Sequence, residues 1–166
     1  MQNSIRLIVF DCDRTLWDHP DVSGLRLPFV RAGADSVKDQ DGVIVTLFPG
    51  VRRMLDELLR QGYILSIASW NDPEAAFQPL TLLELLPLFR HPKADLHIPK
   101  ATMIAEILSD LATEGIRLTP AQVVFIDDRD HHIEAVPVEL PGIHALQMWV
   151  DLKSHDELLA WLEARG

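Results

Sequence analysis

Several mostly apolar, β-prone runs along the chain end abruptly in polar residues. Such runs cover 5–10, 63–68 and 123–126, and a fourth candidate lies at 142–148. A strand that is apolar on both faces is typical of the buried interior of a parallel sheet. The hydrophobic pattern therefore predicts buried parallel strands at these positions.

Between these runs, apolar residues recur at the three- and four-residue spacing of amphipathic helices. One stripe covers 51–59, directly after Pro49-Gly50, and another covers 103–111. Asp72-Pro73-Glu74 is a favourable helix start, because it offers a capping side chain, a proline at the first position and an acid in the first turn. Each of these segments is expected to form a helix between two strands.

A last helix is predicted over 158–162, where Ser154 and Glu157 match the pattern of a capping box. Strands and helices thus alternate through most of the chain, without internal repeats or low-complexity segments. Such alternation is typical of a doubly wound α/β sheet, in which helices cover both faces of parallel strands.

Residues 18–46 break this alternation, because they show no helical period. Asp41-Gly42 lies between two short β-prone segments, 36–38 and 43–45, which is the pattern of a β-hairpin turn. We expect this hairpin to project from the end of the sheet where ligands bind in such folds. It would then form a small flap over the site.

The composition limits the class of protein. A chain of 166 residues is long enough for one domain with a real core, so we expect a single domain over 1–166 with a flap insertion at about 18–46. The content of 48% hydrophobic and 24% charged residues is that of a soluble globular protein. No apolar run approaches the roughly 20 residues that a membrane-spanning helix needs, and the N-terminal segment lacks a signal-peptide core.

Cysteine content and charge suggest the compartment and the partners. The single cysteine, Cys12, excludes an internal disulfide and fits a reducing compartment, so we expect a cytoplasmic protein. The formal net charge is −10, which disfavours nucleic acid and anionic membranes as partners. The same charge opposes phosphorylated substrates, so a phosphate site would need a local positive group such as a metal ion or a lysine.

Polar side chains follow three of the predicted strands directly, in segments 11–15, 69–72 and 127–130. The carboxyl ends of parallel strands converge on one crevice, so these segments should meet there. Carboxylates gathered in one place raise each other's pKa unless a cation compensates. Because the candidate ligands are oxygens, the pattern favours Mg²⁺ over zinc.

Four short motifs occur in a fixed order along nearly the whole chain. They are Asp11-x-Asp13-x-Thr15, Ser69, Lys100 and Asp127-Asp128. In this order they resemble the four motifs of the haloacid dehalogenase (HAD) superfamily, and segments 11–17 and 47–51 resemble its magnesium-dependent phosphatase-1 group. The resemblance implies a Rossmannoid three-layer sandwich with a five-stranded, mostly parallel sheet. It also implies that the Asp11 strand lies near the centre of the sheet, with a small β-hairpin flap and no large cap domain.

The resemblance also implies an activity, the hydrolysis of phosphomonoesters through an aspartyl-phosphate. In that activity Asp11 would be the nucleophile, and Asp13 would be the general acid and base. Magnesium would be held by Asp11, the Asp13 backbone carbonyl, Asp127 and Asp128. The phosphoryl group would be bound by residues that follow the second strand or begin a helix, namely Ser69, Trp70, Asn71 and Lys100.

Some assignments have competitors within the sequence. Lys93 competes with Lys100, which is preferred because it begins a predicted helix, where an anion is favoured. Asp130 is the alternative to Asp128 as the further acidic residue after the third strand. The role of Arg14 stays open, because many members of the superfamily have glycine at that position.

Two tryptophans and two histidines near the motifs have more than one interpretation. Trp17 and Trp70 are either core residues near the crevice or walls of a substrate pocket. His131-His132 are interpreted as surface or substrate-side residues rather than metal ligands, because neighbouring residues on a helix do not share a face.

Alternative functions remain open on the sequence alone. The same scaffold could transfer phosphate to an acceptor other than water, or act as a glyceryl transferase linked to a carrier protein. A non-catalytic binding domain is a further alternative. The substrate would be a phosphorylated small molecule or a phosphoprotein, and the sequence does not indicate an oligomeric state.

Overall fold

The structure is a computed structural model that describes residues 4–165. Its main feature is a five-stranded sheet of order β6-β5-β1-β7-β8, in which all neighbouring strands are parallel. The strands are β1 (Leu7–Phe10), β5 (Ile64–Ser69), β6 (Lys93–Ala94), β7 (Val123–Asp127) and β8 (His144–Gln147). The predicted parallel sheet with the strand before Asp11 at its centre is therefore confirmed.

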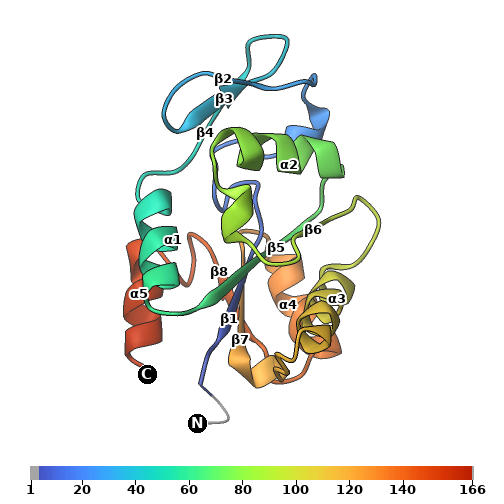
Figure 1. The fold of residues 1–166 in the computed structure, drawn as a ribbon, viewed down its shortest axis with the longest axis vertical. Coiled ribbons are helices and arrows are strands. Elements are labelled where there is room, and N and C mark those ends of the chain that lie inside the picture. Colours follow the sequence, from blue (N-terminus) through green and yellow to red (C-terminus); the bar gives the residue numbers. More distant parts are fainter. Residues whose placement is uncertain (1–3, 166) are drawn as a thin grey trace.

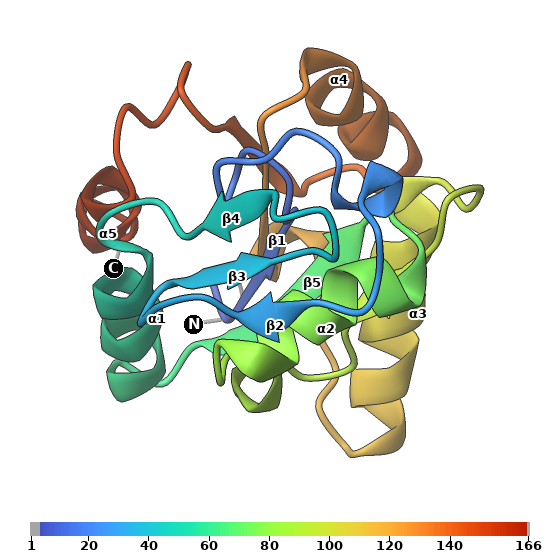
Figure 2. The same ribbon diagram turned by 90° about the horizontal axis from the view of Figure 1, so that it is seen from above.

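Helices cover both faces of this sheet, as the predicted three-layer arrangement requires (Figure 1). On one side lie α1 (Val51–Arg60) and α5 (Asp156–Glu163), and on the other lie α3 (Lys100–Thr113) and α4 (Asp130–Glu139), which is clearest from above (Figure 2). Helix α2 (Pro73–Leu82) lies near the flap. Short 3₁₀ helices occur at Val22–Gly24, Leu86–Leu88 and Pro120–Gln122.

Strand β1 shows why the sheet is buried on both faces. Its side chains alternate between two hydrophobic clusters, because successive residues of a strand point to opposite faces. Ile8 and Phe10 belong to the cluster that includes α1 and α5, whereas Leu7 and Val9 belong to the cluster that includes α3. All four are almost completely buried. This double burial explains the uninterrupted apolar run in the sequence.

The predicted hairpin is present within the expected insertion at 18–46, and a third short strand joins it. Strands β3 (Ser36–Lys38) and β4 (Ile44–Thr46) are antiparallel, and β2 (Val30–Arg31) adds a third strand that the sequence did not indicate. Gly42 in the turn has φ 84°, a value that favours glycine. The Phe29 amide donates to Gln78 of α2 at 3.0 Å, so the flap is tied to the body.

One predicted helix start is confirmed and another is wrong. Asp72 caps α2, because its carboxylate accepts from the Glu74 amide at 3.0 Å. The expected capping box of Ser154 and Glu157 is not formed. Glu157 instead accepts from the Lys153 amide at 2.6 Å, and α5 begins after His155, whose backbone is already helical.

Among residues 4–165, none of the helices combines the length and the apolar character needed to cross a bilayer.

Candidate active site

Asp11 and Asp127 lie side by side at the carboxyl ends of neighbouring strands. Asp11 directly follows β1, and its amide continues the ladder by donating to the Ile126 carbonyl at 2.9 Å. Asp127 is the last residue of β7. Because β1 and β7 are paired in parallel, both carboxylates emerge at the same edge of the sheet.

Lys100 joins these two carboxylates. It is the first residue of α3, and its Nζ donates to Asp11 Oδ1 at 2.8 Å and to Asp127 Oδ2 at 2.9 Å. The lysine is 2% exposed, so its charge is compensated by these carboxylates rather than by water. Lys93, its competitor in the sequence, lies in the edge strand β6 and contacts Asp110 at 2.5 Å. The structure therefore places Lys100, and not Lys93, beside Asp11.

Burial and the neighbouring charges have opposite effects on the pKa values of Asp11 and Lys100. Burial raises the pKa of Asp11, Lys100 opposes that shift, and Asp127 adds to it, with a raised pKa as the result. Burial alone would lower the pKa of Lys100, but its two carboxylate partners outweigh burial and raise it. The two carboxylate contacts therefore favour the charged form of Lys100.

Three carboxylates form a cluster that could hold a metal ion. Asp11, Asp127 and Asp128 each offer an oxygen, and these oxygens all lie within 4.8 Å of one another. Oδ1 of Asp128 is buried and has no hydrogen-bond partner within residues 4–165. Burial raises the pKa of Asp128, as expected for a carboxylate without a cation. An orphaned carboxylate oxygen beside two others fits a hard divalent cation.

Asp130, the alternative to Asp128, occupies a different position. It is exposed in the first turn of α4 and is not part of the carboxylate cluster. The backbone turns into α4 directly after Arg129, so the side chain of Asp130 starts a helix instead of continuing toward Asp11.

Asp13 is held by a separate set of hydrogen bonds. Its Oδ1 accepts from the indole Nε1 of Trp17 at 2.8 Å and from the Val22 amide at 3.4 Å, and its Oδ2 accepts from Asn71 Nδ2 at 3.0 Å. Burial raises the pKa of Asp13 although these donors oppose the shift. Trp17 is fully buried, so of its two interpretations the structure supports the core residue. A fixed carboxyl group with a raised pKa is suited to proton transfer.

Ser69 is the last residue of β5, the strand on the other side of β1, and Asn71 lies two residues later. Asn71 Nδ2 donates to Ser69 Oγ at 2.8 Å as well as to Asp13, so both of its amide hydrogens are used. The amide oxygen of Asn71 accepts from Ser23 Oγ at 2.6 Å. Both Ser69 and Asn71 are buried. In this arrangement Asn71 orients Asp13 and Ser69, a role that the sequence did not indicate.

Trp70 and His132 form one wall of the site. They line the pocket together with Asp11, Asp13, Lys100, Asp127 and Arg129. The two rings pack edge to face, with centroids 4.5 Å apart. His132 is buried, whereas His131 is exposed. Burial, followed by the charge of Lys100, lowers the pKa of His132 to about 4, so this imidazole is neutral near pH 7.

His132 had no assigned role in the expected site, and of its two interpretations, surface or substrate-side, the structure supports the second. Its position offered one signal, because it lies in the first turn of the helix that follows Asp127. The sequence did not show which of the two adjacent histidines faces the site. A helix turns about 100° per residue, so adjacent side chains point in different directions, and here His131 is the exposed one.

The chain matches the family model described as acid phosphatase over residues 3–146. No curated protein matches it. Among solved structures, a HAD-superfamily hydrolase from Ehrlichia chaffeensis is similar with a TM-score of 0.70 and 15% identity, over 97% of this chain and 98% of that one. A haloacid dehalogenase-like hydrolase from Streptococcus pneumoniae has a TM-score of 0.66 and 20% identity, over 97% and 99% of the two chains.

A third similar structure contains magnesium. It is the N-terminal part of a Bacteroides fragilis protein, described as containing a phosphatase domain complexed with Mg. The TM-score is 0.66 at 18% identity, and the match covers 96% of this chain but 40% of that one. At these identities the solved structures show a common fold, and the expected fold class is confirmed by them.

Proposed function

Since this chain belongs to the acid phosphatase family and is a phosphatase of the haloacid dehalogenase superfamily, we propose that it hydrolyses phosphate monoesters through an aspartyl-phosphate on Asp11. The observation that carries this proposal is the contact of buried Lys100 with both Asp11 and Asp127, at 2.8 and 2.9 Å. A cation fixed beside a carboxylate nucleophile is the arrangement that phosphoryl transfer needs, because negative charge gathers on the phosphoryl oxygens.

The cofactor we propose is Mg²⁺. Asp11, Asp127 and Asp128 supply three nearby carboxylate oxygens, one of which has no partner within the described residues. The Asp13 backbone carbonyl is proposed as a fourth ligand. The magnesium in the Bacteroides fragilis structure, which shares the fold, supports this choice. When bound, the ion supplies positive charge that offsets the charge of the phosphoryl group.

In the first step we assign the attack to Asp11. One of its carboxylate oxygens forms a bond to phosphorus while the bond between phosphorus and the alcohol oxygen breaks. Asp13 donates its proton to the departing oxygen, so the alcohol leaves neutral. The raised pKa of Asp13, caused by burial, favours the protonated form that this step requires.

In the second step water replaces the carboxylate. Asp13, now ionised, accepts a proton from the water molecule as its oxygen attacks phosphorus. The bond between phosphorus and Asp11 breaks, which releases inorganic phosphate and restores the Asp11 carboxylate. Throughout, Lys100 and Ser69 are the proposed contacts for phosphoryl oxygens, and Asn71 holds Asp13 at the angle that both proton transfers need.

The shape of the site bears on the substrate. Residues 4–165 form a small flap and no large cap, so we propose that the site takes exposed phosphate groups, on small molecules or on proteins. Membership of the magnesium-dependent phosphatase-1 group, a cytoplasmic location and the absence of nucleic-acid partners stay predictions from the sequence.

The proposal is tested by replacing Asp11 with asparagine, which keeps the shape and removes the nucleophilic oxygen. We expect Asp11→Asn to lower Mg²⁺-dependent hydrolysis of p-nitrophenyl phosphate by at least about 1,000-fold, with an unchanged circular dichroism spectrum. Asp56→Asn, at an exposed position of α1, is the matched control and should keep full activity. If Asp11→Asn kept full activity, Asp11 would not be the nucleophile. If the wild-type protein kept full activity in excess EDTA, the reaction would not need a metal ion.

A further inference from the structure

A cavity of about 640 Å³ lies directly beside the catalytic pocket. Its lining includes Arg14, Phe48, Asp128, Arg129 and Trp149. Arg129 also lines the catalytic pocket, and Asp128 also belongs to the carboxylate cluster, so the cavity and the catalytic pocket share walls. The cavity is therefore next to the position that we propose for the phosphoryl group of a substrate.

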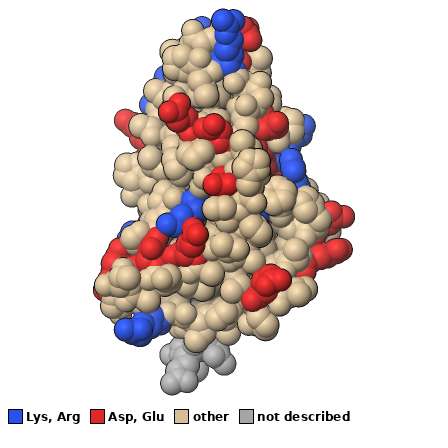
Figure 3. All heavy atoms as spheres, turned by 90° about the vertical axis from the view of Figure 1, so that its right-hand side faces the viewer, with Lys and Arg blue, Asp and Glu red and all other residues tan. Residues whose placement is uncertain are grey.

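The two arginines of the cavity make no salt bridge with any of residues 4–165, although the Asp128 carboxylate lines the same cavity. Arg14 and Arg129 are both exposed. The chain as a whole is acidic, with a net charge of −10, and acidic side chains are spread over the face shown in Figure 3. Two guanidinium groups without ion pairs, beside the proposed phosphate site, therefore give a local positive charge on a protein whose net charge repels anions.

The backbone at the cavity is held in an unfavourable conformation. Arg14 has φ 58° and Trp149 has φ 74°, both in the left-handed region that costs free energy for any residue with a Cβ. Glycine at position 14 would adopt this angle without strain. The chain therefore keeps an exposed arginine that lines the cavity at a position where glycine would be less strained, which points to a use for the guanidinium.

Contacts from the C-terminal part of the chain fix Arg14 in place. Trp149 Nε1 donates to the Arg14 carbonyl at 2.7 Å, and the His155 ring lies 2.7 Å from the Thr15 carbonyl. Trp149 also packs edge to face against Phe48, with ring centroids 4.7 Å apart. Phe48 and Trp149 therefore form an aromatic wall of the cavity. The backbone that carries Arg14 is held by the contacts to the Arg14 and Thr15 carbonyls.

We propose that this cavity binds a second anionic group on the alcohol part of the substrate, through the guanidinium groups of Arg14 and Arg129. The substrates are then small phosphate monoesters that also carry a carboxylate or a second phosphate. Guanidinium binds either group through paired hydrogen bonds, and such charge-assisted bonds are stronger than neutral ones. The inference rests on the proposed phosphatase activity and names the substrate class of the same site.

Two matched substrate pairs test the proposal. In 3-phosphoglycerate a carboxylate replaces the terminal hydroxymethyl group of glycerol 3-phosphate, and in glucose 1,6-bisphosphate a second phosphate is added to glucose 6-phosphate. We expect wild type to prefer the more anionic member of at least one pair by about tenfold or more in kcat/KM. The pair that shows the preference identifies carboxylate or phosphate as the second group.

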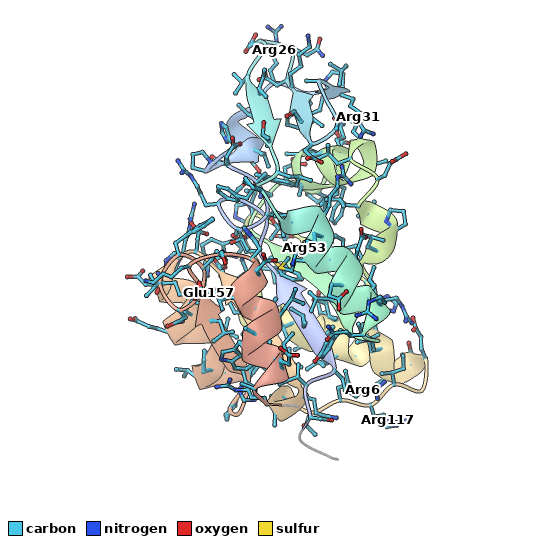
Figure 4. The ribbon with its side chains drawn as sticks, turned by 90° about the vertical axis from the view of Figure 1, so that its left-hand side faces the viewer. Arg6, Arg26, Arg31, Arg53, Arg117 and Glu157 are labelled. Atoms are coloured by element: carbon cyan, nitrogen blue, oxygen red, sulfur yellow. The ribbon has the colours of Figure 1, made fainter. Side chains whose placement is uncertain are left out.

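Arg14→Gly is the decisive variant, because glycine suits the φ of 58° and the chain should fold. It should lower the kcat/KM ratio of the preferred pair by about tenfold, and Arg14→Lys should lower it less, since it keeps the charge without the planar fork. Arg117→Ala is the control and should leave the ratio unchanged. Figure 4 shows Arg117 at the end of the molecule opposite the flap.

Each outcome bears on the proposal. A wild-type protein that hydrolyses p-nitrophenyl phosphate but shows no preference within either pair overturns this inference and leaves the phosphatase proposal intact. The same holds if Arg14→Gly keeps the wild-type ratio. A wild-type protein that hydrolyses none of these phosphate esters, with Mg²⁺ present, overturns both.

Discussion

The side-chain amide of Asn71 makes hydrogen bonds to both Asp13 and Ser69, to which we assign proton transfer and phosphate binding. Its Nδ2 donates to Asp13 at 3.0 Å and to Ser69 at 2.8 Å, while its oxygen accepts from Ser23 at 2.6 Å. With both hydrogens and the carbonyl engaged, the amide has one preferred orientation. We therefore propose that Asn71 positions Asp13, while the phosphate contact expected of Asn71 from the sequence stays a prediction.

Replacing Asn71 with alanine should reduce kcat more than it changes KM. In this variant Asp13 keeps its hydrogen bonds from Trp17 and Val22 but loses the one from Asn71 to Oδ2. Misplacement of a catalytic group by about 1 Å can lower the rate about 100-fold. We expect kcat for p-nitrophenyl phosphate to fall by about 10- to 100-fold in steady-state assays.

Ser23→Ala is the graded control for Asn71→Ala, because it removes one contact of the Asn71 oxygen and leaves the donor to Asp13 in place. Its effect on kcat should be smaller. If Asn71→Ala raised KM and left kcat unchanged, Asn71 would be a substrate contact and not a positioning residue.

Helix starts show how the secondary-structure elements depend on local and distant contacts. Asp72 caps α2 through a bond to an amide two residues later, so the sequence is sufficient to predict it. The start of α5 is different, because His155 lies against the Thr15 carbonyl at 2.7 Å and its backbone is already helical. The expected box at Ser154 therefore gives way to a bond between Glu157 and the Lys153 amide.

This difference predicts unequal effects of two similar substitutions. Asp72→Ala should lower the free energy of unfolding by about 0.5–2 kcal/mol, the usual cost of removing a capping side chain. Ser154→Ala should change it by less than about 0.5 kcal/mol, because no cap bond is lost. Urea unfolding followed by circular dichroism measures both, and equal losses would contradict the assignment of the caps.

At the scale of the whole molecule, the three carboxylates of the cluster repel one another and so affect the stability of the fold. Three carboxylates meet where only Lys100 supplies positive charge by direct contact among the described residues. Burial raises the pKa of Asp11 and of Asp128, and the neighbouring Asp127 raises both further. Without a cation the folded state therefore bears a cost that binding of a divalent ion would remove.

Metal binding should therefore stabilise the whole fold. At a Mg²⁺ concentration about 100 times its Kd, the free energy of unfolding should rise by about 2.7 kcal/mol, which corresponds to a higher Tm by about 5–10 °C. Asp128→Asn should raise the Tm in EDTA, because it removes one of the repelling charges, and should reduce the gain with Mg²⁺. Differential scanning calorimetry measures both effects.

Asp56→Asn provides the reference for this experiment, since Asp56 is exposed on α1 and lies outside the cluster. It should keep the full Mg²⁺ effect. A wild-type Tm that does not respond to Mg²⁺ would argue against a metal site at Asp11, Asp127 and Asp128.

The sequence by itself determined the elements whose signals are local. The strands before Asp11, Ser69 and Asp127 were predictable because burial on both faces of the sheet requires mostly apolar runs, and the hairpin because its turn needs glycine at Gly42. The two-residue strands β2 and β6 were missed, because so short a segment has no period of its own and forms only against a neighbour.

The sequence favoured Lys100 and Asp128 over their competitors, but only the tertiary structure brought these side chains into contact range of Asp11 and added His132. Lys100 lies 89 positions from Asp11, and the Trp149 indole lies 135 positions from the Arg14 carbonyl that it contacts. Local pattern carries no information about such pairs, because they are brought together by the crossing of helices between parallel strands. The chain thus encodes the chemistry in its strand ends, and the packing of the strands brings Lys100, Asp128 and His132 to the site.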